Sequence, residues 1–297
     1  MRFTHHRLYD VLGRIGNELE VSNEVSFEIP NPDRGGRLYA GERLASGDVH
    51  RPLSVWLELA QELGCRLRVP EKLADGFIRL TFEKLSGADS PHAETEVKLA
   101  KYGATSTFSR INKLEDPSFL RAYLEALSRA NLPPVLRVLS LGVNRGDELL
   151  PLDWLKPGAQ VVGLDHSETA LQVAKRRWPQ HSFITMNINE LERLEFSAFD
   201  LMLCLSVLQS PGVNAAKLLR SLVQRFVAKQ GALILSLPNG RYLGGEQLYG
   251  ARLKGYVRAD LSLLVRDAAH YRKYLQQHGF KVYLTGKYEL LLTAVRS

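Results

Sequence analysis

The chain has 297 residues, of which 45% are hydrophobic and 24% are charged, and its formal net charge is +7. No stretch approaches the roughly 20 apolar residues of a membrane span, and the N-terminus lacks the apolar block of a secretory signal. The two cysteines, Cys65 and Cys204, give neither a disulfide framework nor a metal-site spacing. We therefore expect a cytoplasmic protein of about two domains, with no metal.

Residues 1–88 are expected to form a small α/β domain. Two runs with strand composition and one helical run support this prediction: the strands cover residues 23–30 and 76–85, and the helix covers residues 52–64. Residues 86–95 have the composition of a linker, and residues 116–131 predict a helix that leads into the next domain. We therefore expect residues 89–131 to form a linker and a helical cap.

From residue 131 to residue 237, strand patterns alternate with helical patterns. The predicted strands are apolar and bounded by turn residues, and they cover residues 135–141, 159–165, 182–188, part of 199–209, and 232–238. The predicted helices between them cover residues 147–155, 167–178 and 214–231, with Ser167 as an N-cap and Gly231 as a stop signal. Buried strands that alternate with helices indicate a parallel sheet covered on both faces.

The end of the chain departs from this alternation. A long helix is predicted over residues 260–279, and two strands follow over residues 280–286 and 287–295, with Gly286 at the turn between them. A connection this short cannot make a parallel crossover, so the last strand must pair antiparallel with its neighbour. The second domain is therefore expected to span residues 132–297 and to end in a hairpin.

Glycines and polar residues follow the first three predicted strands of the second domain. Gly142 and Gly146 come after the first strand, Asp165 ends the second, and Asn187 ends the third. Ligands of an open parallel sheet bind at the carboxyl ends of its strands. Glycine lets the backbone approach a ligand, and the Asp165 carboxylate can accept hydrogen bonds from two ribose hydroxyls. Asn187, or the backbone N–H of Ile188, can meet an adenine edge, so these positions converge on one nucleoside.

The stretch from Val138 to Val295 resembles a class I S-adenosylmethionine-dependent methyltransferase. The first motif of that family is an acidic residue followed by G-x-G-x-G. The positions here hold Ser140, Gly142, Asn144 and Gly146, so two of three glycines are present and the acid is missing. "VVGLDHS" matches the second motif, "ITMNINEL" the third and "FDLMLCLSVLQ" the fourth.

The resemblance implies an α/β fold in which a Rossmann-like seven-stranded sheet has an antiparallel last strand, beside the smaller N-terminal α/β domain. It also implies S-adenosyl-L-methionine as the cofactor. The implied cofactor-binding residues lie on the glycine turn and at the next three strand ends: Gly142, Asn144, Gly146, Asp165, His166, Asn187, Ile188, Cys204 and Ser206.

A nicotinamide-dependent dehydrogenase has a related sheet and is the nearest alternative. Its G-x-G-x-x-G fingerprint would need glycines where this chain has Asn144 and Asp147, and Asp147 would repel a pyrophosphate. S-adenosylmethionine carries an ammonium and a sulfonium instead of phosphates. Acids such as Asp147 and Glu148 near the turn are therefore compatible with it.

The acceptor of the methyl group is not marked by a known motif. The fourth strand leads into "LSVLQSPG", which lacks the N/D-P-P-Y/F signature of exocyclic and amide nitrogen methylation. That strand offers Cys204 and Ser206 instead of the acid of the Lys-Asp-Lys-Glu set of ribose 2′-O-methyltransferases. The catalytic residues are therefore unknown, and Asn239, Tyr242 and Glu246 are the candidates.

Two segments are candidates for substrate contacts. Residues 238–262 interleave tyrosines with arginine and lysine, so that rings can stack on bases while cations hold phosphates. Residues 101–117 precede the first strand, a region that often folds over the cofactor in the family. An ordinary loop explains residues 238–262 nearly as well, and an ordinary helix explains residues 101–117 nearly as well. The candidate substrate residues are Tyr102, Arg110, Lys113, Arg241, Tyr249, Arg252 and Lys254.

The sequence therefore predicts a methyltransferase whose acceptor is RNA, either transfer or ribosomal RNA. Positive charge is concentrated in residues 131–297, which suits a polyanion, although a solvated basic surface also explains it. One alternative is a methyltransferase for a small-molecule substrate or a protein. The other is a non-catalytic RNA-binding or scaffold protein on a degenerate methyltransferase fold.

Overall fold

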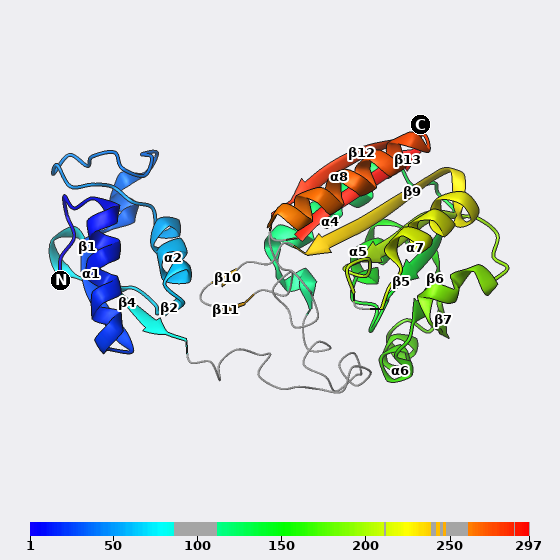
Figure 1. Cartoon of the computed structure of the whole chain (residues 1–297), viewed down its shortest axis with the longest axis horizontal. Helices are drawn as coiled ribbons and strands as arrows, with labels where there is room; N and C mark the ends of the chain where they lie inside the picture. The colour runs from blue at the N-terminus through cyan, green and yellow to red at the C-terminus, as the bar shows by residue number, and fades with distance from the viewer. Residues whose placement is uncertain are drawn as a thin grey trace. The chain divides into compact units, whose positions relative to one another are not determined.

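The computed structural model describes residues 1–85, 112–210, 212–238, 242–243, 246–247, 261–287 and 289–296. These residues fall into two compact units (Figure 1). Unit 1 holds residues 1–85 and the paired strands β10 (Tyr242–Leu243) and β11 (Glu246–Gln247), and unit 2 holds the other described residues. No helix in this described part of the chain is both long and apolar enough to cross a membrane.

Unit 1 is an antiparallel sheet whose apolar residues share one core with two helices. Strand β4 (Phe77–Lys84) pairs with each of the other three strands. The remaining elements are α1 (Leu8–Val21), β1 (Glu24–Pro30), α2 (Leu53–Glu62), β2 (Cys65–Leu67) and β3 (Glu71–Lys72). Alternate residues of β1 and β4, such as Phe27 and Phe82, pack with Trp56 of α2 in that core. The predicted small N-terminal α/β domain is confirmed.

Helix α1 was not predicted from the sequence. It contains Gly13 and Gly16, which lower helix propensity by roughly 1 kcal/mol each relative to alanine. Its apolar residues Val11, Ile15 and Leu19 recur every four positions and are buried in the unit 1 core. Burial of this face therefore outweighs the local preference of the two glycines.

Unit 2 is built on a seven-stranded sheet in the order β12-β13-β9-β8-β5-β6-β7. Its strands are β5 (Arg137–Leu141), β6 (Gln160–Asp165), β7 (Ser182–Thr185), β8 (Phe199–Leu205), β9 (Val227–Pro238), β12 (Phe280–Gly286) and β13 (Glu289–Arg296). Strands β5 to β9 are parallel to their neighbours among themselves, whereas β13 is antiparallel to both β9 and β12. The predicted sheet with an antiparallel last strand is confirmed.

Helices cover both faces of this sheet, and side-chain alternation along the strands separates two cores. Helices α4 (Pro117–Arg129), α5 (Leu149–Leu155) and α6 (Glu168–Arg177) pack on one face, which receives Leu201 and Leu203 of β8. Helices α7 (Ala215–Ser221) and α8 (Leu261–Gln277) pack on the other face, which receives Met202 and Cys204. The chain runs outward from β5 to β7 and then returns to β8 on the other side of β5, so the strand order reverses between β5 and β8.

The helix predicted over residues 214–231 is wrong in its second half. Helix α7 ends at Ser221, a wide turn follows over Leu222–Phe226, and β9 begins at Val227. Gly231 lies inside this strand instead of stopping a helix. A Cβ on Gly231 would lie 3.0 Å from the carbonyl oxygen of Phe199, beside an irregularity in the β8–β9 register. Glycine therefore permits a close approach of two strands here.

The N-terminus of α4 gives a test of local stability. Asp116 Oδ1 accepts hydrogen bonds from the backbone N–H groups of Ser118 and Phe119, at 2.8 and 3.3 Å. We expect Asp116→Ala to lower the free energy of unfolding by about 1 kcal/mol, because it removes this cap. Urea unfolding followed by circular dichroism measures the change. Asp116→Asn keeps an oxygen acceptor and is the matched control; equal losses in both variants would contradict the capping role.

Candidate functional site

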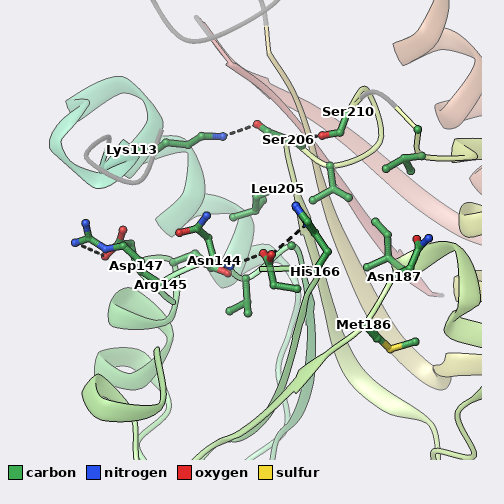
Figure 2. Close-up of a pocket in the computed structure, with 18 of the residues that line it drawn as sticks. Lys113, Asn144, Arg145, Asp147, His166, Met186, Asn187, Leu205, Ser206 and Ser210 are labelled. Atoms are coloured by element: carbon green, nitrogen blue, oxygen red, sulfur yellow. Dashed lines mark hydrogen bonds and ion pairs between the residues drawn. The ribbon is translucent and has the colours of Figure 1, made fainter. Parts of the chain in front are cut away.

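A cavity of about 540 Å³ lies at the carboxyl ends of β5, β6, β7 and β8 in unit 2 (Figure 2). Its described walls come from residues 112–119 and from the segments that follow each of these strands. This is the place where the strand order reverses, which is where ligands of open parallel sheets bind. The volume falls in the range of small-molecule sites, about 300–1,000 Å³.

The turn after β5 brings bare backbone to the cavity wall. Gly142 and Asn144 both line the cavity and both have positive φ, +65° and +45°. A Cβ on Gly142 would lie 2.5 Å from Val207 Cγ2, so a larger residue does not fit there. The Gly142 N–H donates to the carbonyl of Leu164 at 2.7 Å, and the Asn144 N–H donates to Asp165 Oδ2 at 2.9 Å. Strand β6 therefore fixes the shape of this turn.

Gly146 is placed differently from its prediction. It does not line the cavity, although its φ of +72° also requires a left-handed conformation. The Trp178 Nε1–H donates to the Gly146 carbonyl at 2.9 Å, and a Cβ on Gly146 would lie 3.0 Å from the same ring. This glycine makes room for a tryptophan at the end of α6, and its contact with a cofactor stays a prediction.

Asp165 is a buried carboxylate held by backbone on both sides. It ends β6, lines the cavity and is 4% exposed. Oδ2 accepts from the Asn144 N–H, and Oδ1 accepts from the Ser167 N–H at 2.8 Å. The half-exposed imidazole of His166 lies with Nδ1 3.3 Å from Oδ1 and also lines the cavity. A carboxylate has about four lone-pair sites, so each oxygen retains capacity for a ligand hydroxyl.

The segment after β7 forms another wall of the cavity. Strand β7 ends at Thr185, three residues before the predicted end, and Met186, Asn187 and Ile188 then line the cavity. Asn187 Oδ1 accepts from the Asn189 N–H at 3.0 Å and caps the short turn Ile188–Arg193. The side-chain amide therefore holds the loop, while Met186 and Ile188 present apolar surface on which a flat ring can pack.

The two predicted residues at the end of β8 differ in their placement. Cys204 is fully buried in the core on the α7 and α8 face and is not among the described residues of the cavity wall, so its contact with a cofactor stays a prediction. Burial raises the pKa of its thiol to about 12. Ser206 lies just past the strand and lines the cavity. Its φ of +57° is unusual for serine, and residues held in this region cluster at functional sites.

Glu148 supplies a carboxyl group where the sequence motif has lost its acid. Its Oε1 accepts a hydrogen bond from Ser140 Oγ at 2.8 Å, and Glu148 lines the cavity. The Tyr123 hydroxyl donates to the Glu148 carbonyl at 3.1 Å and fixes the start of α5. Burial raises the pKa of the Glu148 carboxyl to about 7, and Asp147 adds to the rise while Ser140 and Lys113 oppose it. From the sequence alone, Glu148 is recognisable only as an acid compatible with a cationic cofactor.

Asp147, the other acid of the turn, already has cationic partners. Arg177 Nη1 donates to Asp147 Oδ1, and Arg145 Nη2 lies 4.0 Å from the same oxygen. Asp147 and Arg145 both line the cavity, where Figure 2 shows them side by side. The charge that Asp147 presents to a ligand is therefore reduced, and Glu148 is the acid without an ion-pair partner within the distance of a salt bridge among the described residues.

Only one of the predicted substrate residues lies in the described cavity wall. Lys113 lines the cavity and donates from Nζ to Ser206 Oγ. The backbones of Tyr242 and Glu246 belong to the small β10–β11 pair of unit 1. The other candidates lie outside the described residues: Tyr102, Arg110, Asn239, Arg241, Tyr249, Arg252 and Lys254.

Residues 134–278 match a family model described as a methyltransferase domain. A search among curated proteins returns no match to the chain. Solved structures with a similar fold include magnesium protoporphyrin IX methyltransferase (ChlM) from Synechocystis PCC 6803 with bound SAH, at 22% identity, a TM-score of 0.44, and coverage of 67% of this chain and 98% of that one.

Two further structures are similar over comparable lengths. The plantazolicin methyltransferase BamL, in complex with a triazolic desmethylPZN analog and SAH, has 13% identity and a TM-score of 0.49 over 67% of this chain and 94% of that one. Precorrin-6y C5,15-methyltransferase from Geobacter metallireducens GS-15 has 12% identity and a TM-score of 0.43 over 60% and 88%. At these values the likenesses carry no conclusion about ligand or substrate.

The family match covers the sheet from β5 into α8 and includes every strand end that borders the cavity. The strand order and the antiparallel last strand agree with the fold that the sequence motifs imply. Residues 134–278 therefore form a methyltransferase domain, and its sheet has the fold of the S-adenosylmethionine-dependent enzymes.

Proposed function

We propose that Asp165 holds the ribose of S-adenosylmethionine and that other residues of the cavity wall contact the rest of the cofactor. The supporting observation is a buried carboxylate at a strand end, fixed by two backbone N–H groups and still able to accept from vicinal hydroxyls. Met186 and Ile188 offer apolar surface for the adenine ring, and the backbone of Ile188 offers its polar groups to the ring edge. The glycine turn at Gly142 leaves room for the amino-acid part.

Glu148 is the proposed partner of the cofactor ammonium. Ser140 occupies the position of the acid in the family motif. The Glu148 carboxyl accepts a hydrogen bond from Ser140 and borders the cavity. An ammonium beside it would favour the ionised form of this partly buried carboxyl. The bound cofactor supplies an electrophilic methyl group, and the chain binds it, orients it and excludes water from it.

We propose RNA, either transfer or ribosomal, as the acceptor. The basic excess of residues 131–297 supports this proposal, because clustered cations raise the local concentration of a polyanion. Unit 1, with its own core, is proposed to help hold that acceptor. A small-molecule acceptor is the second candidate, and the volume of the cavity favours it.

The ribose contact is tested by Asp165→Asn. The variant keeps one oxygen acceptor but loses the charge and one acceptor, so we expect the affinity for S-adenosylhomocysteine to fall about tenfold to a hundredfold. Isothermal titration measures the affinity, and a thermal melt checks folding. Glu168→Gln, an exposed acid on the neighbouring helix α6, is the matched control. Unchanged affinity in Asp165→Asn would place the ribose elsewhere.

The raised pKa of Glu148 gives a pH-dependent stability. The folded chain keeps the Glu148 proton up to about pH 7, whereas an unfolded chain releases it near 4.5. The stabilisation is therefore complete below pH 4.5 and is lost as the pH rises through 7. We expect Glu148→Gln, without cofactor, to match the parent near pH 4.5 and to exceed its free energy of unfolding by up to about 3 kcal/mol at pH 8. Urea unfolding at both pH values measures this difference.

The same variant separates burial from cofactor binding. Glutamine has no charge for an ammonium, so at pH 8 we expect Glu148→Gln to bind S-adenosylhomocysteine at least tenfold more weakly despite its higher stability. Glu190→Gln, at an exposed acid paired with Arg193, is the control. A stabilised variant with unchanged affinity would confirm the burial and remove Glu148 from the cofactor site.

The RNA proposal predicts salt-dependent binding of the whole chain to bulk transfer RNA. Release of counterions should give a logarithmic slope of affinity against salt of about −3 or steeper, which corresponds to several phosphate contacts. Filter binding over a series of salt concentrations measures the slope, and poly-L-glutamate is the control polyanion. A flat slope, or equal binding of both polyanions, would favour the small-molecule acceptor.

A further inference from the structure

Four polar side chains from distant parts of the sequence meet at one end of the cavity. Lys113 Nζ donates to Glu289 Oε1 at 2.8 Å and to Ser206 Oγ, the contact that Figure 2 marks. The hydroxyls of Ser206 and Ser236 both donate to the same Glu289 oxygen. The Ser206 N–H donates to Ser236 Oγ at 2.8 Å. We call these four residues the lysine cluster.

Forming the lysine cluster costs free energy of desolvation and backbone strain, so the cluster contributes little to the stability of the fold. The side chains of Lys113 and Glu289 are only 19% and 8% exposed, and Ser236 is fully buried. Desolvation of such a pair consumes most of its Coulombic gain. Ser206 also has a left-handed backbone conformation, which is strained for a residue that carries a β-carbon. Costs of this kind are typical of sites that act on a ligand.

The donor groups of the lysine cluster lie at the cavity wall, and the carboxylate of Glu289 lies behind them. Lys113 and Ser206 line the cavity, whereas Glu289 is not among the described lining residues. Three donors converge on Glu289 Oε1, so that oxygen is already fully engaged. Glu289 and Ser236 are positioning residues: they hold the ammonium and the hydroxyl in place at the cavity wall.

The cluster also lies apart from the proposed nucleoside contacts. Ser206 follows β8 and Ser236 is on β9, while Asp165 and Asn187 belong to the ends of β6 and β7 on the other side of β5. Figure 2 shows Lys113 and Ser206 on a different side of the cavity from Met186 and Asn187. A ligand whose nucleoside lies over β6 and β7 would therefore direct its far end, and the molecule that reacts with it, toward the lysine cluster.

From this geometry we infer that the methyl acceptor is an ionised oxygen, such as a carboxylate, held by Lys113 and Ser206. This inference rests on the proposed cofactor site and names the acceptor group of that site. Unmodified RNA bases and ribose carry no carboxylate, so the inference favours the small-molecule acceptor, the second of the two candidates. The oxygen forms a bond to the methyl carbon, the carbon–sulfur bond breaks with its electron pair left on sulfur, and no proton has to be removed. A neutral nitrogen acceptor would gain positive charge during the same step, beside the Lys113 ammonium.

The inference is tested by binding before any substrate is known. Benzoate and its neutral isostere benzamide are titrated into the full chain saturated with S-adenosylhomocysteine, and chemical shifts or heats are followed. We expect benzoate to bind about tenfold more tightly or better, because charge-assisted hydrogen bonds require the anion. Lys113→Met should remove the preference and Lys113→Arg should retain part of it. Lys217→Met, at a surface lysine paired with Glu192 outside the described cavity wall, is the control. No preference for benzoate in the parent chain, including no detectable binding of either probe, would overturn the inference.

A transfer experiment gives the second readout. Methyl-¹³C S-adenosylmethionine is supplied with fractionated cell extract, and the chemical shift of the labelled methyl carbon identifies the atom to which it is bound. A methyl ester supports the inference, and an N-methyl, C-methyl or alkyl methyl ether product overturns it. If the parent chain does not bind S-adenosylhomocysteine, the proposed function fails. Failure of the proposed function is therefore distinguishable from failure of the inference about the acceptor.

Discussion

The carboxylate of Asp165 is the interaction on which the rest of the site depends. One oxygen holds the N–H of Asn144 and the other holds the N–H of Ser167, so a single side chain ties the glycine turn of β5 to the start of α6. Because Gly142 lies against Val207, the same turn also fixes the segment after β8. The cavity is thus shaped by backbone groups that one buried charge keeps in position.

The two ends of the cavity are formed by different kinds of groups. The end near β6 and β7 relies on main-chain turns and apolar surface, which suit the constant nucleoside of a common cofactor. The end near β8 relies on the lysine cluster, whose members come from four separate segments. One fold hosts many functions through the side chains of its sites, so this end is the one where enzymes of this fold can differ in their acceptors.

The sequence predicted those features that depend on local pattern. Strand periodicity and turn residues placed Asp165 at a strand end, and a short connection required the antiparallel hairpin. The features that it missed depend on tertiary contacts. Nothing local shows that Glu148 folds back onto Ser140, or that Glu289 reaches Lys113. Cys204 and Ser206 differ in placement because a positive φ at Ser206 breaks the alternation of the strand.

The position of β13 has a consequence for how the enzyme is assembled. This strand follows the other described strands along the chain, yet it inserts between β9 and β12, and its first residue is Glu289. During translation, β5 to β9 can pair while the slot beside β9 is still vacant. The ion pair of Lys113 with Glu289 can form only when β13 enters the sheet. Closing the sheet and assembling the proposed acceptor end are therefore one folding step.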